Sequence, residues 1–191
     1  KGFAIHWLMP REKRPVESGW TTGPRKSWEY LKQTYKRGYN VGVRLGSPSK
    51  IGNEFLTVVD VDIKSTDENH KLEALQAAKR VLGESFRKCP VVFSGRGNGS
   101  RHYYCLSREP FKTFNPYASN EEVKVHSPSK RPSKKEIEKL SQTELIGGIR
   151  ISRAWEISLY SDGRQVVLPP SIHPDSGREY VWKEGTFDLP V

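Results

Sequence analysis

Apolar and polar positions alternate most regularly in the middle of the chain. Residues 55–63, FLTVVDVDI, are rich in β-branched side chains and predict a strand with one apolar and one polar face. Residues 39–46, YNVGVRLG, predict another strand. The polar segment 47–53 between them is predicted to be a turn.

Apolar residues at helical spacing predict three helices. Residues 25–37 carry tryptophan, leucine and tyrosine at this spacing and are followed by a glycine. A second helix is expected from Asp67, its capping residue, to Leu82. A third is expected over residues 134–145, with Ser133 as its cap.

Further strands are predicted on either side of the third helix. Residues 90–95 and 101–107 flank the glycine-rich turn GRGNGS and predict a hairpin. The last third of the chain predicts three more strands, over residues 148–160, 164–171 and 178–182. Because strands dominate and hairpins outnumber parallel crossovers, we expect an α+β fold with a mostly antiparallel sheet.

Composition and charge narrow the possible partners. The 191 residues are 35% hydrophobic and 28% charged, which is typical of a globular protein. We expect one unit over residues 1–191, with an exposed basic insert at about 119–145. The 32 lysines and arginines exceed the 22 aspartates and glutamates, so the net charge is +10. This excess favours polyanionic partners, although it also occurs in proteins that have none.

The sequence shows no membrane span, and it has too few cysteines for a disulfide framework. No run of about twenty apolar residues and no signal peptide is present, so we expect a cytoplasmic protein without membrane contact. Because the chain begins with Lys1, we expect a fragment of a longer protein. Its two cysteines, Cys89 and Cys105, are expected at buried apolar positions beside strands, so any metal would be held by oxygen ligands.

The first candidate site lies on the predicted strand 55–63. Strand periodicity puts Asp60 and Asp62 on the face opposite the valines. Two carboxylates about 7 Å apart along a strand repel each other unless a cation neutralises them. The pattern therefore favours a divalent metal, and the alternative is a solvated sheet face.

The second candidate site is the segment SGRGNGSRH. Its glycines expose backbone amides, and Ser100, Arg101 and His102 add a hydroxyl, a guanidinium and an imidazole. These groups together suit a phosphate. The segment matches neither a P-loop nor a dinucleotide-binding fingerprint. The alternative is an ordinary hairpin turn.

A third acid and a stiff turn complete the candidates. In the segment WEISLY, Glu156 alternates with apolar residues and faces away from the core. Here the alternative is again an exposed sheet face. Downstream, two prolines end a predicted strand abruptly and fix a turn that carries Ser171 and His173.

The order of these motifs resembles the primase-polymerase branch of the archaeo-eukaryotic primase superfamily. The similarity covers about residues 13–182 and runs through KRP, Trp20, YNVGVRLG, VVDVDI, SGRGNGSRHYYC and WEISLYSDGRQVVLPPSIHPDSGREYVW. It implies a catalytic module like an RNA-recognition motif (RRM), joined to a smaller α/β lobe. Two positions differ from the family pattern, since Glu156 stands where aspartate is common and Gln165 where a tyrosine is frequent.

The resemblance also implies an activity, namely template-directed nucleotidyl transfer as in a DNA primase and polymerase. Asp60, Asp62 and Glu156 would then hold two Mg²⁺ or Mn²⁺ ions. The incoming dNTP or NTP would be bound by the residues Arg44, Ser100, Arg101, His102 and Ser171.

Nucleic-acid partners follow from the same resemblance. We expect a single-stranded DNA template and a primer, bound through basic residues of the insert, which are Lys130, Arg131, Lys134 and Lys135. We also expect a helicase, either as a domain that follows this fragment or as a separate protein, in the replication of a nucleoid or mobile element.

Two other functions fit parts of the pattern. A metal-dependent nuclease or replication-initiator nickase would also use clustered acids and a basic surface. The chain has neither a pair of histidines flanking one apolar residue nor an obvious nucleophilic tyrosine for a nickase. A non-catalytic module that binds single strands would use Tyr103 and Tyr104 for stacking.

Overall fold

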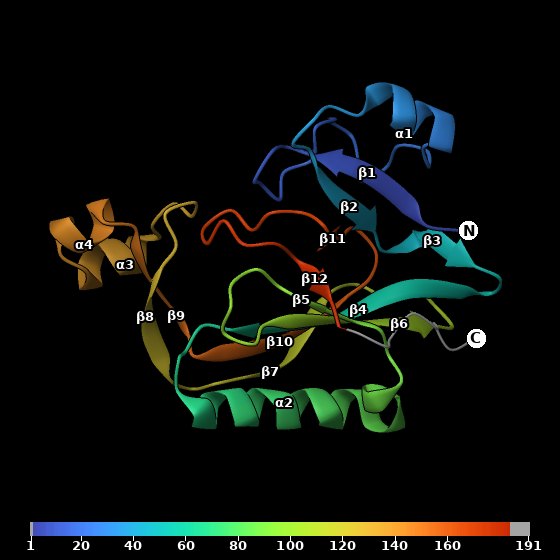
Figure 1. Ribbon diagram of the computed structural model, residues 1–191. Coiled ribbons are helices and arrows are strands. Elements are labelled where there is room, and N and C mark those ends of the chain that lie inside the picture. Colours follow the sequence, from blue (N-terminus) through green and yellow to red (C-terminus); the bar gives the residue numbers. More distant parts are fainter. Residues whose placement is uncertain (1, 184–191) are drawn as a thin grey trace.

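The computed structural model describes residues 2–183 and consists of three antiparallel sheets with a few helices (Figure 1). Every strand pair in this range is antiparallel, so the predicted α+β class with a mostly antiparallel sheet is confirmed. The largest sheet has the order β12-β5-β6-β4-β10-β7, and β3 also pairs with β4. Its strands are β3 (Gly46–Ile51), β4 (Glu54–Ile63), β5 (Val91–Phe93), β6 (Arg101–Ser107), β7 (Phe114–Ala118), β10 (Trp155–Tyr160) and β12 (Val181–Trp182).

Two smaller sheets flank the large one. The first has the order β1-β2-β11, and the second joins β8 to β9. Their strands are β1 (Ala4–Leu8), β2 (Asn40–Arg44), β11 (Gln165–Leu168), β8 (Glu122–His126) and β9 (Ile149–Arg153). The helices are α1 (Trp28–Thr34), α2 (Glu68–Leu82), α3 (Lys134–Lys139) and α4 (Gln142–Ile146), with a 3₁₀ helix, η1, at Gly83–Arg87.

Strand β4 lies between two hydrophobic layers. On one face Val61 and Ile63 pack in a core with the alanines of α2, which runs along this face of the sheet (Figure 1). On the other face Leu56 and Val58 pack against residues of the β1-β2-β11 sheet. The large sheet is therefore covered on both faces at its centre, and Leu56 to Ile63 of β4 contribute to both layers.

Local capping signals identified the starts of two helices, α2 and α3, correctly. Asp67 accepts a hydrogen bond from the Asn69 N–H at the start of α2. Ser133 caps α3 in a reciprocal capping box with Glu136. α1 is shorter than the predicted segment and starts after the cap Ser27.

Several predicted elements differ from the structure. The predicted helix 134–145 is two helices, because Leu140 is extended and buried and Ser141 caps α4 anew. The predicted strand 148–160 divides at Ala154, whose N–H donates to Glu121 while its carbonyl accepts from the Lys64 and Ser65 amides. The chain thus changes partner from β8 to β4 at this residue.

Other strands were missed. The predicted turn 47–53 contains most of β3, where the Ser49 hydroxyl accepts from the Ala4 N–H and donates to the Arg44 carbonyl. The polar segment predicted as an exposed insert contains β8, and β1 and β7 also went unpredicted. No helix in the described range is long and apolar enough to cross a membrane.

Candidate active site

The strand register gathers the predicted acids and the histidine on one face of the large sheet. Glu156 of β10 lies directly opposite Asp62 of β4, and His102 of β6 lies directly opposite Asp60. Directly opposed residues of antiparallel strands point to the same side. All four side chains therefore share the face away from α2, where the first candidate site was expected.

Asp60 and His102 form the buried floor of this face. The His102 Nε2 lies 3.4 Å from an Asp60 carboxylate oxygen, and Tyr160 lines the same cavity as these two residues. Burial and the neighbouring charge of Asp62 raise the pKa of Asp60 to about 7. Burial and the positive charge of Lys13 lower the pKa of His102 to about 3, so its imidazole is neutral.

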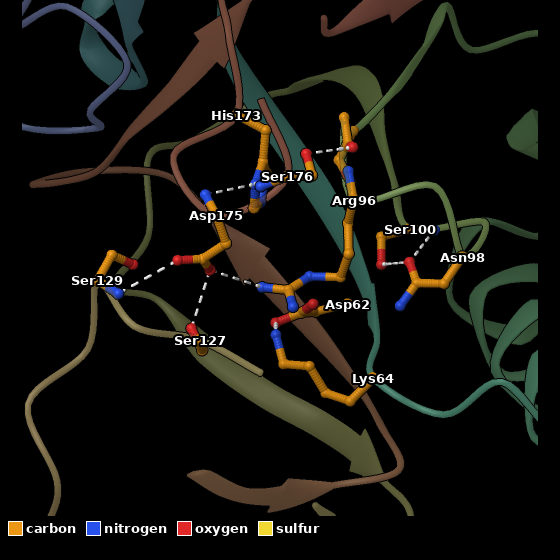
Figure 2. A network of polar contacts seen from close by, with 12 residues as sticks. Asp62, Lys64, Arg96, Asn98, Ser100, Ser127, Ser129, His173, Asp175 and Ser176 are labelled. Carbon is orange, nitrogen blue, oxygen red and sulfur yellow. Dashed lines mark hydrogen bonds and ion pairs between the residues drawn. The ribbon is translucent and has the colours of Figure 1, made fainter. Parts of the chain in front are cut away.

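Asp62, unlike Asp60, lies beside two cationic side chains. Its carboxylate forms an ion pair with Lys64, whose side chain is 6% exposed. Burial works to raise the pKa of Asp62, but Lys64 and then Arg96 outweigh it and keep the pKa below its ordinary value. Asp62 therefore stays ionised, and Figure 2 shows both cations beside it.

Glu156 is half-buried and accepts a hydrogen bond from the Asn115 side chain. Within residues 2–183, no group of three or more histidine, cysteine, aspartate or glutamate side chains is arranged to hold a metal ion. The three predicted ligands thus share one face of the sheet, while Asp62 is engaged by Lys64 and Glu156 by Asn115.

The glycine-rich loop divides its polar residues between structure and site. The Ser100 hydroxyl accepts from the Ile63 N–H at 2.9 Å and donates to the Ile63 carbonyl, so it anchors the loop to β4. Arg101 lies opposite Val61 in register and its guanidinium covers the Phe93 ring, on the face toward α2. Neither side chain is directed at the acids.

Arg96 of the same loop does reach the acids, although its sequence context did not single it out. Its guanidinium lies 3.8 Å from Asp175, whose side chain is 8% exposed. Asp175 also accepts hydrogen bonds from the Ser127 hydroxyl and the Ser129 amide (Figure 2). Arg96 and Asp175 therefore connect three segments that are far apart in the sequence.

A close backbone approach explains one glycine of this loop. A Cβ on Gly95 would lie 2.3 Å from the Arg178 carbonyl oxygen, too close for any side chain. Gly95 lets the loop pack directly on the segment after β11. This packing brings Arg96 close to Asp175.

The two remaining predicted nucleotide ligands have structural partners. The Ser171 hydroxyl accepts from the Val41 N–H at 2.7 Å and fixes the turn after β11 to β2. The Arg44 guanidinium donates to the carbonyls of Gly23 and Thr21. It lines a separate cavity beside β1, not the cavity next to Asp60.

A chain of cavities with many cationic residues extends from the acids to the insert. Lys13, Asp60, His102 and Tyr180 line the first cavity. Lys13 also lines a larger one of about 600 Å³, together with Arg96 and Lys130. The third, beyond it, has five cationic residues in its wall, which are Lys64, Arg96, Lys130, Arg131 and Arg150. We call these three cavities the cationic passage.

The four predicted insert cations are in two different environments. Lys130 and Arg131 line the cationic passage and have no ion pair among the described residues. Lys134 and Lys135 line none of its cavities. Lys135 is paired with Glu122 at 2.5 Å. Of the four predicted cations, only Lys130 and Arg131 therefore line the passage that leads to Asp60.

Four residues near the acids were not predicted as site residues, because their sequence contexts give only weak signals. Lys13 is part of the KRP segment, Lys64 lies two residues after Asp62, and Arg96 stands between glycines. Asp175 follows the proline-rich turn. Each has an ordinary sequence context, and only the contacts between segments bring them together.

The cationic side chains beside the strand acids are groups that suit the binding of phosphates. The sequence model of the bifunctional DNA primase/polymerase family, N-terminal domain, matches residues 1–191, and the chain belongs to this family. It is therefore a DNA primase/polymerase-type protein of DNA replication, with nucleic acid and nucleotides as substrates. No curated protein and no solved structure matches the chain.

Proposed function

We propose that this chain adds nucleotides to a primer on a single-stranded DNA template, using dNTPs or NTPs, and also starts strands as a primase. One observation carries the proposal. The register of β4, β6 and β10 puts Asp60, Asp62, His102 and Glu156 on one face. At Asp60 and His102 this face opens into the first cavity of the cationic passage, which suits phosphates.

Asp60, Asp62 and Glu156 would hold the two Mg²⁺ or Mn²⁺ ions of this activity. Their carboxylate oxygens are the ligands that these ions prefer. The repulsion between Asp60 and Asp62, which contributes to the raised pKa of Asp60, is what a divalent cation would relieve. When bound, such ions activate the attacking 3′-hydroxyl and neutralise the departing pyrophosphate. Lys64 pairs with one carboxylate oxygen of Asp62, so the other oxygen is the one that would bind an ion while this pair persists.

The triphosphate of the incoming nucleotide would lie in the first cavities of the passage. Lys13 and Arg96 supply positive charge there, and His102 and Tyr180 line the floor. The buried His102 Nδ1 and Tyr180 hydroxyl have no hydrogen-bond partner among residues 2–183. Buried polar atoms are rarely left without partners, so these two support a polar ligand at this position. Arg96 thus replaces Arg101 in our assignment.

Template or primer phosphates would contact the far end of the passage. Lys130 and Arg131 line it without an ion pair in the described part of the chain, whereas the buried Arg150 guanidinium donates to backbone carbonyls. Phosphate contacts hold a strand in position without selecting its bases. A cytoplasmic setting and a helicase partner, as a further domain or a separate protein, are also part of the proposal.

The topology supports an RRM-like module within the large sheet. Its four central strands have the order β10-β4-β6-β5, and α2 connects β4 to β5. Strands β1, β2 and β11 with α1 would then form the smaller lobe (Figure 1).

Nucleotide incorporation on a primed, labelled template tests the proposal. We expect the double variant Asp60→Ala/Asp62→Ala and the single variant Glu156→Ala each to lower incorporation by more than about a hundredfold. Mutation of a residue that only hydrogen-bonds a metal ligand already lowers activity or metal affinity by about 10- to 100-fold. Glu109→Ala, an exposed carboxylate, is the matched control. Near-normal synthesis by the double variant would refute the assignment. Metal-dependent shortening of the strand would indicate a nuclease, and binding without either reaction a non-catalytic module.

A further inference from the structure

The two cysteines of the chain lie in direct contact. Cys89 precedes β5 and is 2% exposed, while Cys105 belongs to β6 and is half-buried. Their sulfur atoms are 2.9 Å apart, and both are free thiols. The sequence predicted buried positions beside strands, but no pattern in it indicated that the two would meet.

The strand register explains the contact. The Tyr104 N–H donates to the Pro90 carbonyl at 2.9 Å, and Val91 pairs with Tyr103. Cys89 and Cys105 are therefore directly opposed, in a position without hydrogen bonds between them. Cα atoms in such pairs are about 4.5 Å apart. This separation lies at the short end of the range that a disulfide spans, about 4.4 to 6.8 Å.

We propose that Cys89 and Cys105 form a site of reversible disulfide formation, a modification independent of the proposed nucleotidyl transfer. The oxidant would be a small disulfide such as oxidised glutathione. Cys105, the more exposed of the two thiols, loses its proton as it attacks one oxidant sulfur and releases one glutathione thiolate. Cys89 then attacks the mixed disulfide and releases the second. Two protein thiols are oxidised, one disulfide is reduced to two thiols, and the two protons pass to the released thiolates.

The hydrogen bond between the sulfurs affects the two thiols of the reduced protein in opposite ways. It lowers the pKa of Cys89, although burial works to raise it. The same hydrogen bond, with burial, raises the pKa of Cys105. The second step depends on the contact between the two sulfurs, which places Cys89 to attack a mixed disulfide on Cys105.

The bond would tether the base of the hairpin that carries Arg96 and His102. Residues 89–105 would become a closed loop, which lowers the entropy of the unfolded chain. Both cysteines pack in the core on the α2 face, away from Asp60. We therefore expect higher stability with an unobstructed acidic face.

Intact-mass measurement after treatment of the folded protein with oxidised glutathione tests the inference. The untreated protein should take up two maleimide labels under denaturing conditions. The treated protein should take up none and should have lost two hydrogen atoms, and dithiothreitol should restore both labels. Its melting temperature should rise by roughly 5 °C or more.

Single variants separate the two steps. Cys89→Ser should stop at a glutathione adduct on Cys105, while Cys105→Ser should stay largely unmodified because Cys89 is buried. The measurement on the unchanged protein stands even where a variant fails to fold. Two free thiols, or stable glutathione adducts on both cysteines, would overturn the inference whether or not the protein polymerises nucleotides.

Discussion

Arg96 and Arg101 are five residues apart and carry the same guanidinium, yet the structure gives them opposite surroundings. Arg101 alternates with His102 along β6 and so points toward α2. Arg96 precedes the strand in a loop that Gly95 allows to pack on the Arg178 backbone, and it extends toward Asp62 and Asp175. The direction of each side chain, set by the strand at Arg101 and by loop packing at Arg96, thus decides which arginine can contact a phosphate.

We predict that Arg96→Ala raises the KM for the incoming nucleotide by about 10- to 100-fold. A hydrogen bond to a charged group contributes roughly 1.5–3 kcal/mol, and about 1.4 kcal/mol corresponds to a factor of ten. Arg101→Ala, the matched control, should change KM by no more than about threefold. Steady-state incorporation kinetics measure both values. A larger effect from Arg101→Ala would reverse our assignment.

His173 is a buried histidine that stabilises the turn after β11. Its Nδ1 accepts hydrogen bonds from the backbone amides of Asp175 and Ser176, and its ring packs on Tyr180. Burial, followed by the charges of Lys13 and Arg96, lowers the pKa of His173 to about 4, and nearby Asp175 only partly opposes this. The folded protein therefore keeps this imidazole neutral over a pH range where the unfolded chain protonates it.

This difference predicts a loss of stability in mild acid. Between about pH 6.5 and pH 4 the unfolded state binds the additional proton, so the free energy of unfolding falls as the pH falls. The contribution of His173 is complete above about pH 6.5 and amounts to up to about 3 kcal/mol. His173→Asn keeps an acceptor for the two amides and does not titrate, so urea unfolding at several pH values should show a shallower decline. Equal declines in both proteins would contradict the assignment.

Among the elements, the insert is more ordered than its composition suggests. β8 pairs with β9 over five residues, and capping boxes start both α3 and α4. Ion pairs within the insert join Lys124 to Glu144 and Lys135 to Glu122. Much of its positive charge is thus neutralised locally, and Lys130 and Arg131 are the cations that it presents to the passage.

Salt dependence should separate these two groups of cations. Each phosphate contact on a single strand contributes about 0.7 to the slope of log affinity against log salt concentration. We predict that Lys130→Ala with Arg131→Ala flattens this slope by about 1 to 1.5 units, while Lys134→Ala with Lys135→Ala leaves it nearly unchanged. Fluorescence anisotropy with labelled single-stranded DNA measures both. An equal or larger change in the control pair would mean that the strand follows the outer face of α3.

Across the whole molecule, one sheet supports both the core and the site. Ile157 of β10 is fully buried against the α2 layer, and its neighbour in sequence, Glu156, lies on the acidic face. The hydrophobic layer beneath the acids keeps β4, β6 and β10 in register. Stability and site geometry therefore depend on the same strands.

Truncation of this layer should be costly. Ile157→Ala removes a fully buried side chain and should lower the free energy of unfolding by about 2–5 kcal/mol. Ile146→Ala, the same change at a residue that is 80% exposed, should stay within about 0.5 kcal/mol. Chemical denaturation measures both changes. A small effect at Ile157 would mean that the layer repacks around the cavity.

Features that depend on near neighbours could be predicted from the sequence alone. Alternation along β4 predicted that Asp60 and Asp62 face away from Val61, because successive residues of a strand point to opposite sides. The caps Asp67 and Ser133 were predicted because a capping side chain bonds an amide two or three residues away. The order of the motifs also predicted the family.

Contacts between distant segments depend instead on the folded chain. The pairing of β10 with both β4 and β7 gave Glu156 its place opposite Asp62, and the break at Ala154 followed from the same exchange of partners. Arg96 reached Asp175 across 79 positions of sequence, and Cys89 met Cys105 through strand register. Such contacts follow from strand registers and loop packing that the whole core fixes at once, so no local pattern of residues contains them.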